Sequence, residues 1–329
     1  MESIEICAGA GGQAIGLEQA GFGHTALIEI DYSACNTLRV NRPSWNVIEG
    51  DVKSFNAAKY KGIDLLAGGV PCPPFSVAGK QLGHEDERNL FPEVIRLTSE
   101  CLPKAIMIEN VKGLLDPKFE WYRNYITSEI QKLGYVCHWQ LLNACDFNVP
   151  QLRPRTIMVA LKEEYNRYFK WPKPNVKCAP TVGEALLEEM SSNGWQGAEE
   201  WSRKANKIAP TIVGGSKKHG GADLGPTRSK IAWEKLGVDG SGLNEDAPGR
   251  SFVGNPKLTV RMAAILQGFP RDWSFSGKKT NAYRQVGNAF PPPVAKAVGL
   301  QIKAAIELCE LHNKEDGEIY ENEAFRIAR

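Results

Sequence analysis

A cysteine between prolines is the residue best suited to covalent chemistry in this sequence. Cys72 lies in residues 68–76, GGVPCPPFS, directly after the short apolar segment 64–67. Ligands of open α/β sheets bind beyond the carboxyl ends of the strands, where a nucleophile is useful. Pro71 and Pro73 stiffen the loop and fix the direction of the sulfur. The alternative, a small buried hydrophobic residue, is the interpretation we prefer for the other seven cysteines.

A carboxylate and two arginines are expected near the same crevice. Glu109 follows the apolar segment 105–108 in the sequence Glu-Asn-Val. Arg153 and Arg155 precede the apolar segment 156–161, and residues two apart in an extended chain face the same side. Fixed cations beside a carboxylate and a thiol indicate an oxyanion or phosphate site. The alternative is that Glu109 is a solvated cap and that the arginines lie in water.

A glycine-rich turn near the N-terminus predicts a cofactor site. Residues 4–7 read as a strand that runs into Gly9-Ala10-Gly11-Gly12 and then a helix. Such a turn lets backbone N–H groups and a helix N-terminus approach a polar ligand. Glu29, 20 residues after Gly9, can accept both hydroxyls of a ribose, and Asp51 can reach a base edge. An adenosine-type cofactor is expected, with tight packing of the glycines as the alternative.

The glycine spacing favours S-adenosyl-L-methionine over a dinucleotide. The dinucleotide fingerprint is G-x-G-x-x-G, but here Gly12 follows Gly11 at once and the next glycine is Gly16. The usual approach to a pyrophosphate is therefore missing.

The apolar pattern that carries these residues predicts an α/β fold. The first 160 residues alternate short apolar runs with helical patterns, which is typical of parallel strands joined by right-handed helical crossovers. We expect strands near 4–7, 26–30, 64–67, 105–108 and 156–161, and helices at 14–20, 91–101, 259–267 and 293–311.

A change in residue composition and periodicity near Trp171 predicts a second domain. Prolines, glycines and clustered charge replace regular periodicity until about Pro256. We expect a catalytic, cofactor-binding domain at 1–170 and 256–311 and a smaller, loop-rich domain at 171–255. Residues 312–329 are polar and are expected to form a frayed tail.

Composition excludes several classes of protein. With 329 residues, 42% hydrophobic and 24% charged, the chain is not a disordered tail, a collagen-like fibre or a disulfide-stapled miniprotein. The N-terminus has no signal-peptide pattern and no apolar run is long enough to span a membrane, so a soluble, cytoplasmic protein with free thiols is expected. No C-x-x-C pair occurs and the histidines are scattered, so no metal site is predicted.

The motifs in their order resemble those of the DNA cytosine-5 methyltransferases of bacterial restriction-modification systems. The resemblance rests on CAGAGG, Glu29, Asp51, GGVPCPPFS, ENV, QLRPR, LTVRMAAILQGFP and AYRQVGNAFPPP. It implies an S-adenosylmethionine-dependent methyltransferase fold, with a doubly wound, mostly parallel sheet. It also implies that residues 171–255 form the target recognition domain.

The resemblance also assigns roles to single residues. Cys72 would add to carbon 6 of a flipped cytosine, and Glu109 would hold nitrogen 3 and the exocyclic amine. Arg155 would bind the ring carbonyl and Arg153 would support the site. The implied cofactor-binding residues are Cys7, Ala8, Gly9, Gly11, Gly12, Glu29, Ile30, Asp51, Val52, Pro71, Asn288 and Ala289.

The sequence departs from the family pattern at two positions. Cys7 stands where the family usually has an aromatic residue packed on the adenine, so that stacking contact is absent. Pro73 stands where a glutamine commonly follows the cysteine, so any polar role of that glutamine is absent too.

Duplex DNA is the expected partner. Seven cations face one acid between Arg203 and Lys230, in a chain whose formal net charge is only +2. The residues predicted to contact DNA are Ser76, Thr211, Lys217, Lys218 and Arg228. A solvated loop is the alternative for this segment.

Other functions stay open at this point. An RNA cytosine-5 methyltransferase would share the cofactor and the thiol chemistry, although the long insertion before Pro256 favours duplex DNA. A non-enzymatic DNA-binding regulator would tolerate loss of Cys72 or Glu109, yet both are present. We expect a monomer that works beside a restriction endonuclease.

Overall fold

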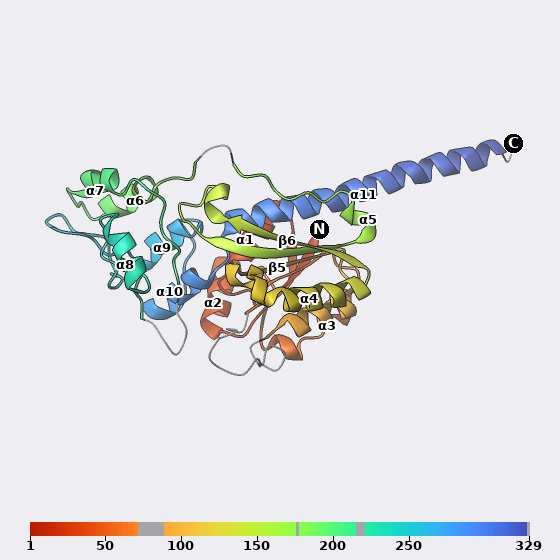
Figure 1. Ribbon diagram of the computed structural model, residues 1–329, viewed down its shortest axis with the longest axis horizontal. Helices are drawn as coiled ribbons and strands as arrows, with labels where there is room; N and C mark the ends of the chain where they lie inside the picture. The colour runs from red at the N-terminus through yellow and green to blue at the C-terminus, as the bar shows by residue number, and fades with distance from the viewer. Residues whose placement is uncertain (72–88, 176–177, 215–220, 328–329) are drawn as a thin grey trace.

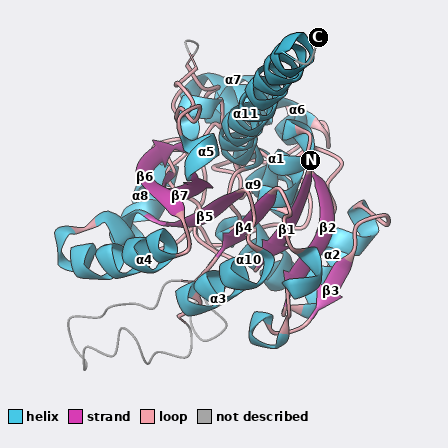
Figure 2. Cartoon of the chain, turned by 90° about the vertical axis from the view of Figure 1, so that its right-hand side faces the viewer, coloured by secondary structure: helices cyan, strands magenta, loops and turns pink. Residues whose placement is uncertain are grey.

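The computed structural model describes residues 1–71, 89–175, 178–214 and 221–327, and in the last helix it describes side chains as far as Lys314. At its centre lies a seven-stranded sheet in the order β3-β2-β1-β4-β5-β7-β6, whose strands follow one another across Figure 2. The strands are β1 (Glu2–Ile6), β2 (Gly23–Glu29), β3 (Val47–Glu49), β4 (Leu65–Gly69), β5 (Ala105–Val111), β6 (Tyr135–Asn143) and β7 (Pro154–Lys162).

The sheet is mostly parallel, but its β7 edge is not. Strands β1 to β5 pair in parallel, whereas β7 is antiparallel to both β5 and β6. The predicted parallel pairing of segment 156–161 was therefore wrong. Only residues 144–153 connect β6 to β7, and a parallel neighbour needs a crossover of a dozen or more residues, so the chain reverses instead. Strand β6 escaped prediction because most of its residues are only partly buried.

Alternating apolar residues give the sheet two buried faces. One face packs against α3 (Phe91–Cys101) and α4 (Glu120–Lys132), and its strand residues include Ile4, Ile6 and Ile106. The other face packs against α1 (Gly12–Ala20) and α11 (Pro292–Ile327), and its strand residues include Leu65, Ala67 and Met107. This covering on both sides is the doubly wound arrangement that the sequence predicts.

The predicted helices are present with small shifts of their ends. Helices α1, α3, α9 (Val260–Leu266) and α11 overlap the four predicted ranges. The backbone of α11, however, stays helical to Ile327 and projects far beyond the body of the molecule (Figure 1), where the sequence predicted a frayed tail. Glutamate, lysine and alanine in this stretch favour a helix despite its polarity. The remaining helices are α2 (Tyr32–Asn41), α5 (Glu163–Asn166), α6 (Val182–Ser191), α7 (Ala198–Lys204), α8 (Thr227–Glu234) and α10 (Lys279–Asn288).

Helices α6 to α10 gather at one end of the molecule (Figure 1). Their apolar residues, among them Met190, Trp201 and Trp233, belong to one buried cluster that also contains Ala14 of α1 and Leu38 of α2. The segment 171–255 therefore packs directly on the cofactor-binding half, and its boundaries stay a prediction. Among the described residues, no helix combines the length and the apolar character needed to cross a membrane.

Candidate active site

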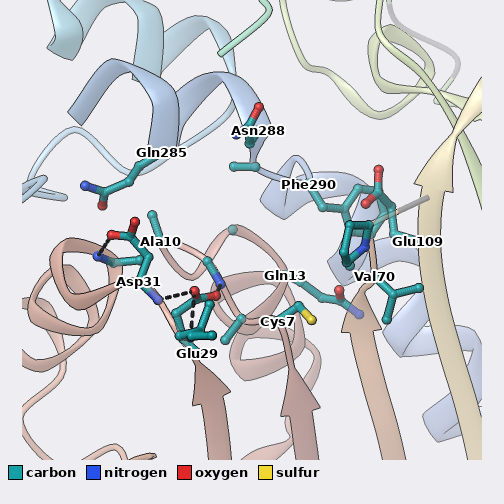
Figure 3. A pocket seen from close by; sticks show the side chains of 18 of the residues that line it. Cys7, Ala10, Gln13, Glu29, Asp31, Val70, Glu109, Gln285, Asn288 and Phe290 are labelled. Carbon is teal, nitrogen blue, oxygen red and sulfur yellow. Dashed lines mark hydrogen bonds between the residues drawn. The ribbon is translucent and has the colours of Figure 1, made fainter. Parts of the chain in front are cut away.

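A cavity of about 920 Å³ opens at the carboxyl ends of the parallel strands. This volume lies within the range of small-molecule sites. Figure 3 shows Glu29 and Asp31 at one side, Val70 and Glu109 at the other, and Gln285 and Asn288 of α10 above. The cavity is therefore lined by two parts of the chain that are far apart in sequence, the ends of the parallel strands and α10.

The glycine-rich turn is held by the carboxylate of Glu29. Oε2 accepts a hydrogen bond of 2.7 Å from Gly9 N, and Oε1 accepts bonds of 2.8 and 2.7 Å from Ile30 N and Asp31 N (Figure 3). Gly9 has φ 53°, and nothing lies within 4 Å of where its Cβ would be, so it leaves open space. A carboxylate has about four acceptor positions, so Glu29 retains one for a ligand hydroxyl.

The next glycines of the turn have a packing role. A Cβ on Gly11, whose φ is 88°, would lie 2.8 Å from Leu38 Cδ2, and Gly11 does not line the cavity. A Cβ on Gly12 would lie 2.3 Å from the carbonyl oxygen of Phe290. Both positions let α1 pack closely on its neighbours, so the packing alternative applies to them.

Most of the predicted cofactor residues meet at this cavity. Ile30, at its rim, is 67% exposed and offers an apolar surface to a ligand. All the predicted residues except Gly11 line the cavity: Cys7, Ala8, Gly9, Gly12, Glu29, Ile30, Asp51, Val52, Pro71, Asn288 and Ala289.

Cys7 lines the cavity as a neutral thiol. Burial raises its pKa to about 12, and the nearby carboxylate of Glu29 adds to the shift. Its φ of 52° is unusual for a residue other than glycine. Cys7 is therefore a poor nucleophile, and it contributes a small apolar surface to the site.

Two buried polar residues of the cavity were missed by the sequence analysis. Glu5 of β1 is almost fully buried, and its Oε2 has no hydrogen-bond partner among the described residues. Gln13 Oε1 of α1 is also without a partner there. Burial raises the pKa of Glu5 well above its usual range, and Glu29 raises it further. An acid in the middle of an apolar strand was the available signal.

These donors and acceptors fit S-adenosylmethionine. Glu29 and Asp51 suit the ribose and the base, Ile30 and Val52 offer apolar surface, and the unsatisfied acceptor of Glu5 suits a cationic group. Among the described residues, no cluster of three or more His, Cys, Asp or Glu side chains is placed to hold a metal ion.

At the other end of the cavity, Glu109 and Arg155 form an ion pair. Glu109 Oε1 lies 2.7 Å from Arg155 Nε, since Val111 of β5 pairs with Arg155 of β7 in the antiparallel register. Burial raises the pKa of Glu109, and the positive charges of Arg155 and Arg153 oppose this shift. Arg155 Nη1 also donates to Pro154 O at 2.8 Å. A carboxyl group and a guanidinium thus line the same cavity.

Arg153 lies outside the cavity wall and joins three segments. It is 0% exposed, and its guanidinium donates to the carbonyl oxygens of Ile212, Gly287 and Ala289 at 2.6, 2.8 and 2.9 Å. Burial lowers the pKa of Arg153, and the positive charge of Arg155 lowers it further. Arg153 therefore supports the segments around residues 212 and 288 that close the cavity.

Gln151 and Gln267 extend this buried network. Gln151 Oε1 accepts from Ile212 N at 2.8 Å, and its Nε2 donates to Gln267 Oε1 at 2.6 Å. Gln267 Nε2 in turn donates to Ala289 O at 2.6 Å. Sequence reasoning missed both amides as supports because their partners are distant in the chain.

Asn110 supports the loop that leads to the predicted nucleophile. Its Nδ2 donates a hydrogen bond of 2.9 Å to Val70 O, two residues before Cys72. Cys72, Ser76, Lys217 and Lys218 lie outside the described residues, so their predicted roles stay predictions.

The two described DNA-contact residues lie apart from the cavity lining. The hydroxyl of Thr211 donates to Leu152 O, so its single hydrogen is already used. Arg228 lies exposed in the first turn of α8 and takes part in no ion pair among the described residues. Nearby Lys230 is paired with Asp223 at 2.8 Å.

Comparisons with known proteins agree with this arrangement. A family model described as C-5 cytosine-specific DNA methylase matches residues 1–304. The chain is 61% identical over 308 residues to the type II methyltransferase M.NgoMIV of Neisseria gonorrhoeae, covering 93% of this chain and 98% of that protein. It is 54% identical to the type II methyltransferase M.NaeI of Lentzea aerocolonigenes, covering 94% of this chain and 76% of that protein.

Solved structures share the fold at low identity. A putative DNA modification methyltransferase encoded within an E. coli prophage superposes with a TM-score of 0.66 at 23% identity, covering 93% of this chain and 99% of that one. DNMT2 of Spodoptera frugiperda gives a TM-score of 0.62 at 17% identity, with coverage of 93% and 99%. The family match and the curated relatives show that the chain belongs to the C-5 cytosine-specific DNA methylases, as a DNA (cytosine-5)-methyltransferase with S-adenosylmethionine as methyl donor.

Proposed function

We propose that this enzyme methylates carbon 5 of a cytosine flipped out of duplex DNA, with the cofactor on the Glu29 side of the cavity and the base on the Glu109 side. The observation that carries the proposal is that one cavity is lined both by the glycine-rich turn and by the Glu109–Arg155 ion pair. Extrusion of the base, which costs a few kcal/mol, is required because carbon 6 cannot be reached inside a stacked duplex.

The cofactor would be held by residues of the first three strands and of α10. Glu29 would accept from one ribose hydroxyl, because backbone N–H groups take three of its roughly four acceptor positions. Asp51 would face the adenine edge, and Glu5 would accept from the amino group of the methionine part. When bound, S-adenosylmethionine supplies an electrophilic methyl group.

Cys72 would act on the base as a nucleophile. Its thiolate adds to carbon 6 of the cytosine, and the electron pair of the ring double bond makes carbon 5 nucleophilic. After carbon 5 has taken the methyl group, its proton leaves, the double bond re-forms and the thiolate is expelled. The bond from Asn110 to Val70 O supports this role because it fixes the chain just before Cys72.

Glu109 and Arg155 would limit the charge that develops on the ring. Because burial raises the pKa of Glu109, its proton is more readily retained for donation to nitrogen 3. The guanidinium of Arg155, which lines the cavity beside Glu109, would donate to the ring carbonyl oxygen.

We further propose that residues 171–255 are the target recognition domain and that 1–170 and 256–311 are the catalytic domain. Arg228 would read a base edge, while Lys217, Lys218 and Thr211 would contact phosphates. Because the hydroxyl hydrogen of Thr211 is donated to Leu152 O, that contact needs the hydroxyl to turn. The relatives' designation as type II methyltransferases supports a role beside a restriction endonuclease. That the enzyme is a cytoplasmic monomer stays a prediction.

Covalent trapping tests this mechanism. Duplex DNA with 5-fluorocytosine at its target position cannot lose a proton from carbon 5, so the wild-type enzyme with S-adenosylmethionine should form a complex that survives denaturing electrophoresis. Cys72→Ala should form none, and Cys178→Ala, which changes an exposed free cysteine, should behave like the wild type. A covalent complex with the Cys72 variant would refute the role of this residue.

A further inference from the structure

A short segment after α9 contacts the glycine-rich turn at Ala10, next to the residue that Glu29 holds. The indole Nε1 of Trp273 donates a hydrogen bond of 3.1 Å to the carbonyl oxygen of Ala10. The ring is only 6% exposed, and its Cζ2 lies 3.0 Å from the position a Cβ on Gly11 would occupy. Trp273 thus contacts the turn through one hydrogen bond and lies close to Gly11 through Cζ2.

The turn needs such support because its own backbone is unusual. Cys7, Gly9 and Gly11 have φ values of 52°, 53° and 88°, so three residues within five positions are left-handed. Gly11 is the N-cap of α1 and provides no side-chain cap. Glu29 fixes the N–H of Gly9 on one side, and the indole fixes the carbonyl of Ala10 on the other.

Trp273 is itself held firmly against α2. The guanidinium of Arg42 lies 5.3 Å from the centre of the Trp273 ring and is paired with Glu18 of α1 at 3.0 Å. Asn41 Nδ2 donates to Ser274 O at 2.7 Å, and Ser274 N donates to Asn41 Oδ1 at 2.9 Å. The indole therefore has little freedom to leave Ala10.

The same segment positions a second wall of the cavity. Ser276 N donates to Thr37 Oγ1 at 2.8 Å, and that hydroxyl donates to Gln285 Oε1 at 2.6 Å. Gln285 Nε2 donates back to Ser276 O at 2.8 Å, and Gln285 lines the cavity on α10. Residues 273–276 thus connect the turn, α2 and α10.

We propose that Trp273 is a positioning residue for cofactor binding, which sets the glycine-rich turn by fixing the carbonyl of Ala10. The proposal rests on cofactor binding at this cavity. Removing the donor leaves a buried carbonyl without a partner, and the turn must then shift or remain unsatisfied. The base side of the cavity, around Glu109, makes no described contact with Trp273.

The test compares Trp273→Phe with Trp45→Phe. The first variant keeps an aromatic ring and loses the donor. The second variant alters Trp45, whose ring also lies beside the guanidinium of Arg42 and is 6.0 Å from the ring of Trp273. Trp45 makes no described hydrogen bond to the turn. For Trp273→Phe, the Kd of S-adenosylmethionine by calorimetry should rise by about five- to twenty-fold. The kcat at saturating cofactor and the Kd for DNA measured without cofactor should stay within about twofold, and Trp45→Phe should match the wild type.

A second measurement needs no cofactor. In the unliganded protein, amide hydrogen exchange of a peptide covering residues 7–15 should be faster in Trp273→Phe and unchanged in Trp45→Phe. If the cofactor does not bind at this cavity, exchange should still differ between the two variants, but neither variant nor the wild type should bind S-adenosylmethionine. That result would overturn the cofactor role of Trp273. An unchanged cofactor Kd, or equal effects in both variants, would also overturn it.

Asn41→Ala serves if Trp273→Phe does not fold. This variant removes both side-chain hydrogen bonds to Ser274 and keeps the tryptophan at position 273, which is then held less firmly. Exchange and the cofactor Kd should both rise, by less than in Trp273→Phe. No change in either quantity would contradict the proposal.

Discussion

Glu109 and Cys7 show how burial sets the chemistry of single residues here. Burial raises the pKa of both groups, yet the consequences differ. A carboxyl that retains its proton is a useful donor to a ring nitrogen, whereas a thiol that retains its proton is inert. The two groups line the same cavity and would serve the base and the cofactor respectively.

Glu109→Gln should reduce turnover strongly without unfolding the enzyme. Glutamine keeps the shape and can still accept from Arg155, but it has no acidic proton for nitrogen 3. We expect kcat to fall by at least about 100-fold, the scale of a lost general acid. Steady-state methylation at neutral pH measures this. Glu49→Gln, at a surface ion pair with Arg39, is the control, and near-normal turnover of the Glu109 variant would refute the assignment.

Cys7→Phe should tighten cofactor binding. The sulfur lines the cavity where the family usually has an aromatic ring, so a phenyl group restores a stacking surface. An aromatic pair is worth about 0.5–1.5 kcal/mol, which corresponds to a Kd lower by about two- to twelve-fold. Calorimetry measures the change, and Cys7→Ala, which adds no ring, should not show it. Unchanged or weaker binding by a folded Cys7→Phe protein would count against this prediction.

At the scale of elements, β1 contains a buried acid that links stability to pH. Glu5 lies in a strand whose neighbours on the chain are Ile4 and Ile6, and burial raises its pKa well above the usual range. A group whose native pKa is raised binds its proton more tightly when folded. The contribution of Glu5 to the free energy of unfolding is therefore complete below the pKa that it has in the unfolded chain. This contribution is lost as pH rises through its pKa in the folded protein.

The free energy of unfolding without cofactor should consequently fall as pH rises above the ordinary pKa of a glutamate and through the raised native pKa of Glu5, and it should fall less in Glu5→Gln. Urea titrations at several pH values measure this. Glu2→Gln, at the exposed start of the same strand, should keep the wild-type dependence. Equal pH dependence in wild type and Glu5→Gln would show that Glu5 does not carry the effect.

The elements were largely predictable from sequence, but their edges and supports were not. Apolar runs such as 105–108 identify buried strands because both faces of the sheet are covered. The antiparallel β7 depends on the short connection from β6, which periodicity does not report. The partners of Arg153 are separated from it by 59, 134 and 136 positions in the sequence, and no local pattern encodes such partners. The contact of Trp273 with Ala10, across 263 positions, could not be predicted for the same reason.

At the scale of the whole molecule, residues 171–255 and the first two helices share one buried apolar cluster beside the cavity. Gly214 and Gly287 approach so closely that a Cβ on Gly287 would lie 2.3 Å from Gly214 N. This contact connects the middle of the proposed target recognition domain to α10, which lines the cavity. We therefore expect DNA binding and cofactor binding to influence one another.

Lysines of the target region should set the salt dependence of DNA binding. Each phosphate contact contributes about −0.9 to the slope of log affinity against log salt. Replacing Lys217 and Lys218 with alanine should flatten the slope by about one to two units. Fluorescence anisotropy at several salt concentrations measures it, with Lys296 and Lys303 of α11 changed to alanine as control. An unaltered slope would exclude phosphate contacts by these lysines.

The most direct test of the account identifies the methylated product. The enzyme is incubated with S-adenosylmethionine labelled in its methyl group and with either duplex DNA or transfer RNA, and the nucleic acid is digested to nucleosides. We expect label in 5-methyldeoxycytidine from duplex DNA, no label from transfer RNA, and loss of the label in Cys72→Ala. Label in transfer RNA alone, or in duplex DNA at a position other than carbon 5 of cytosine, would contradict it.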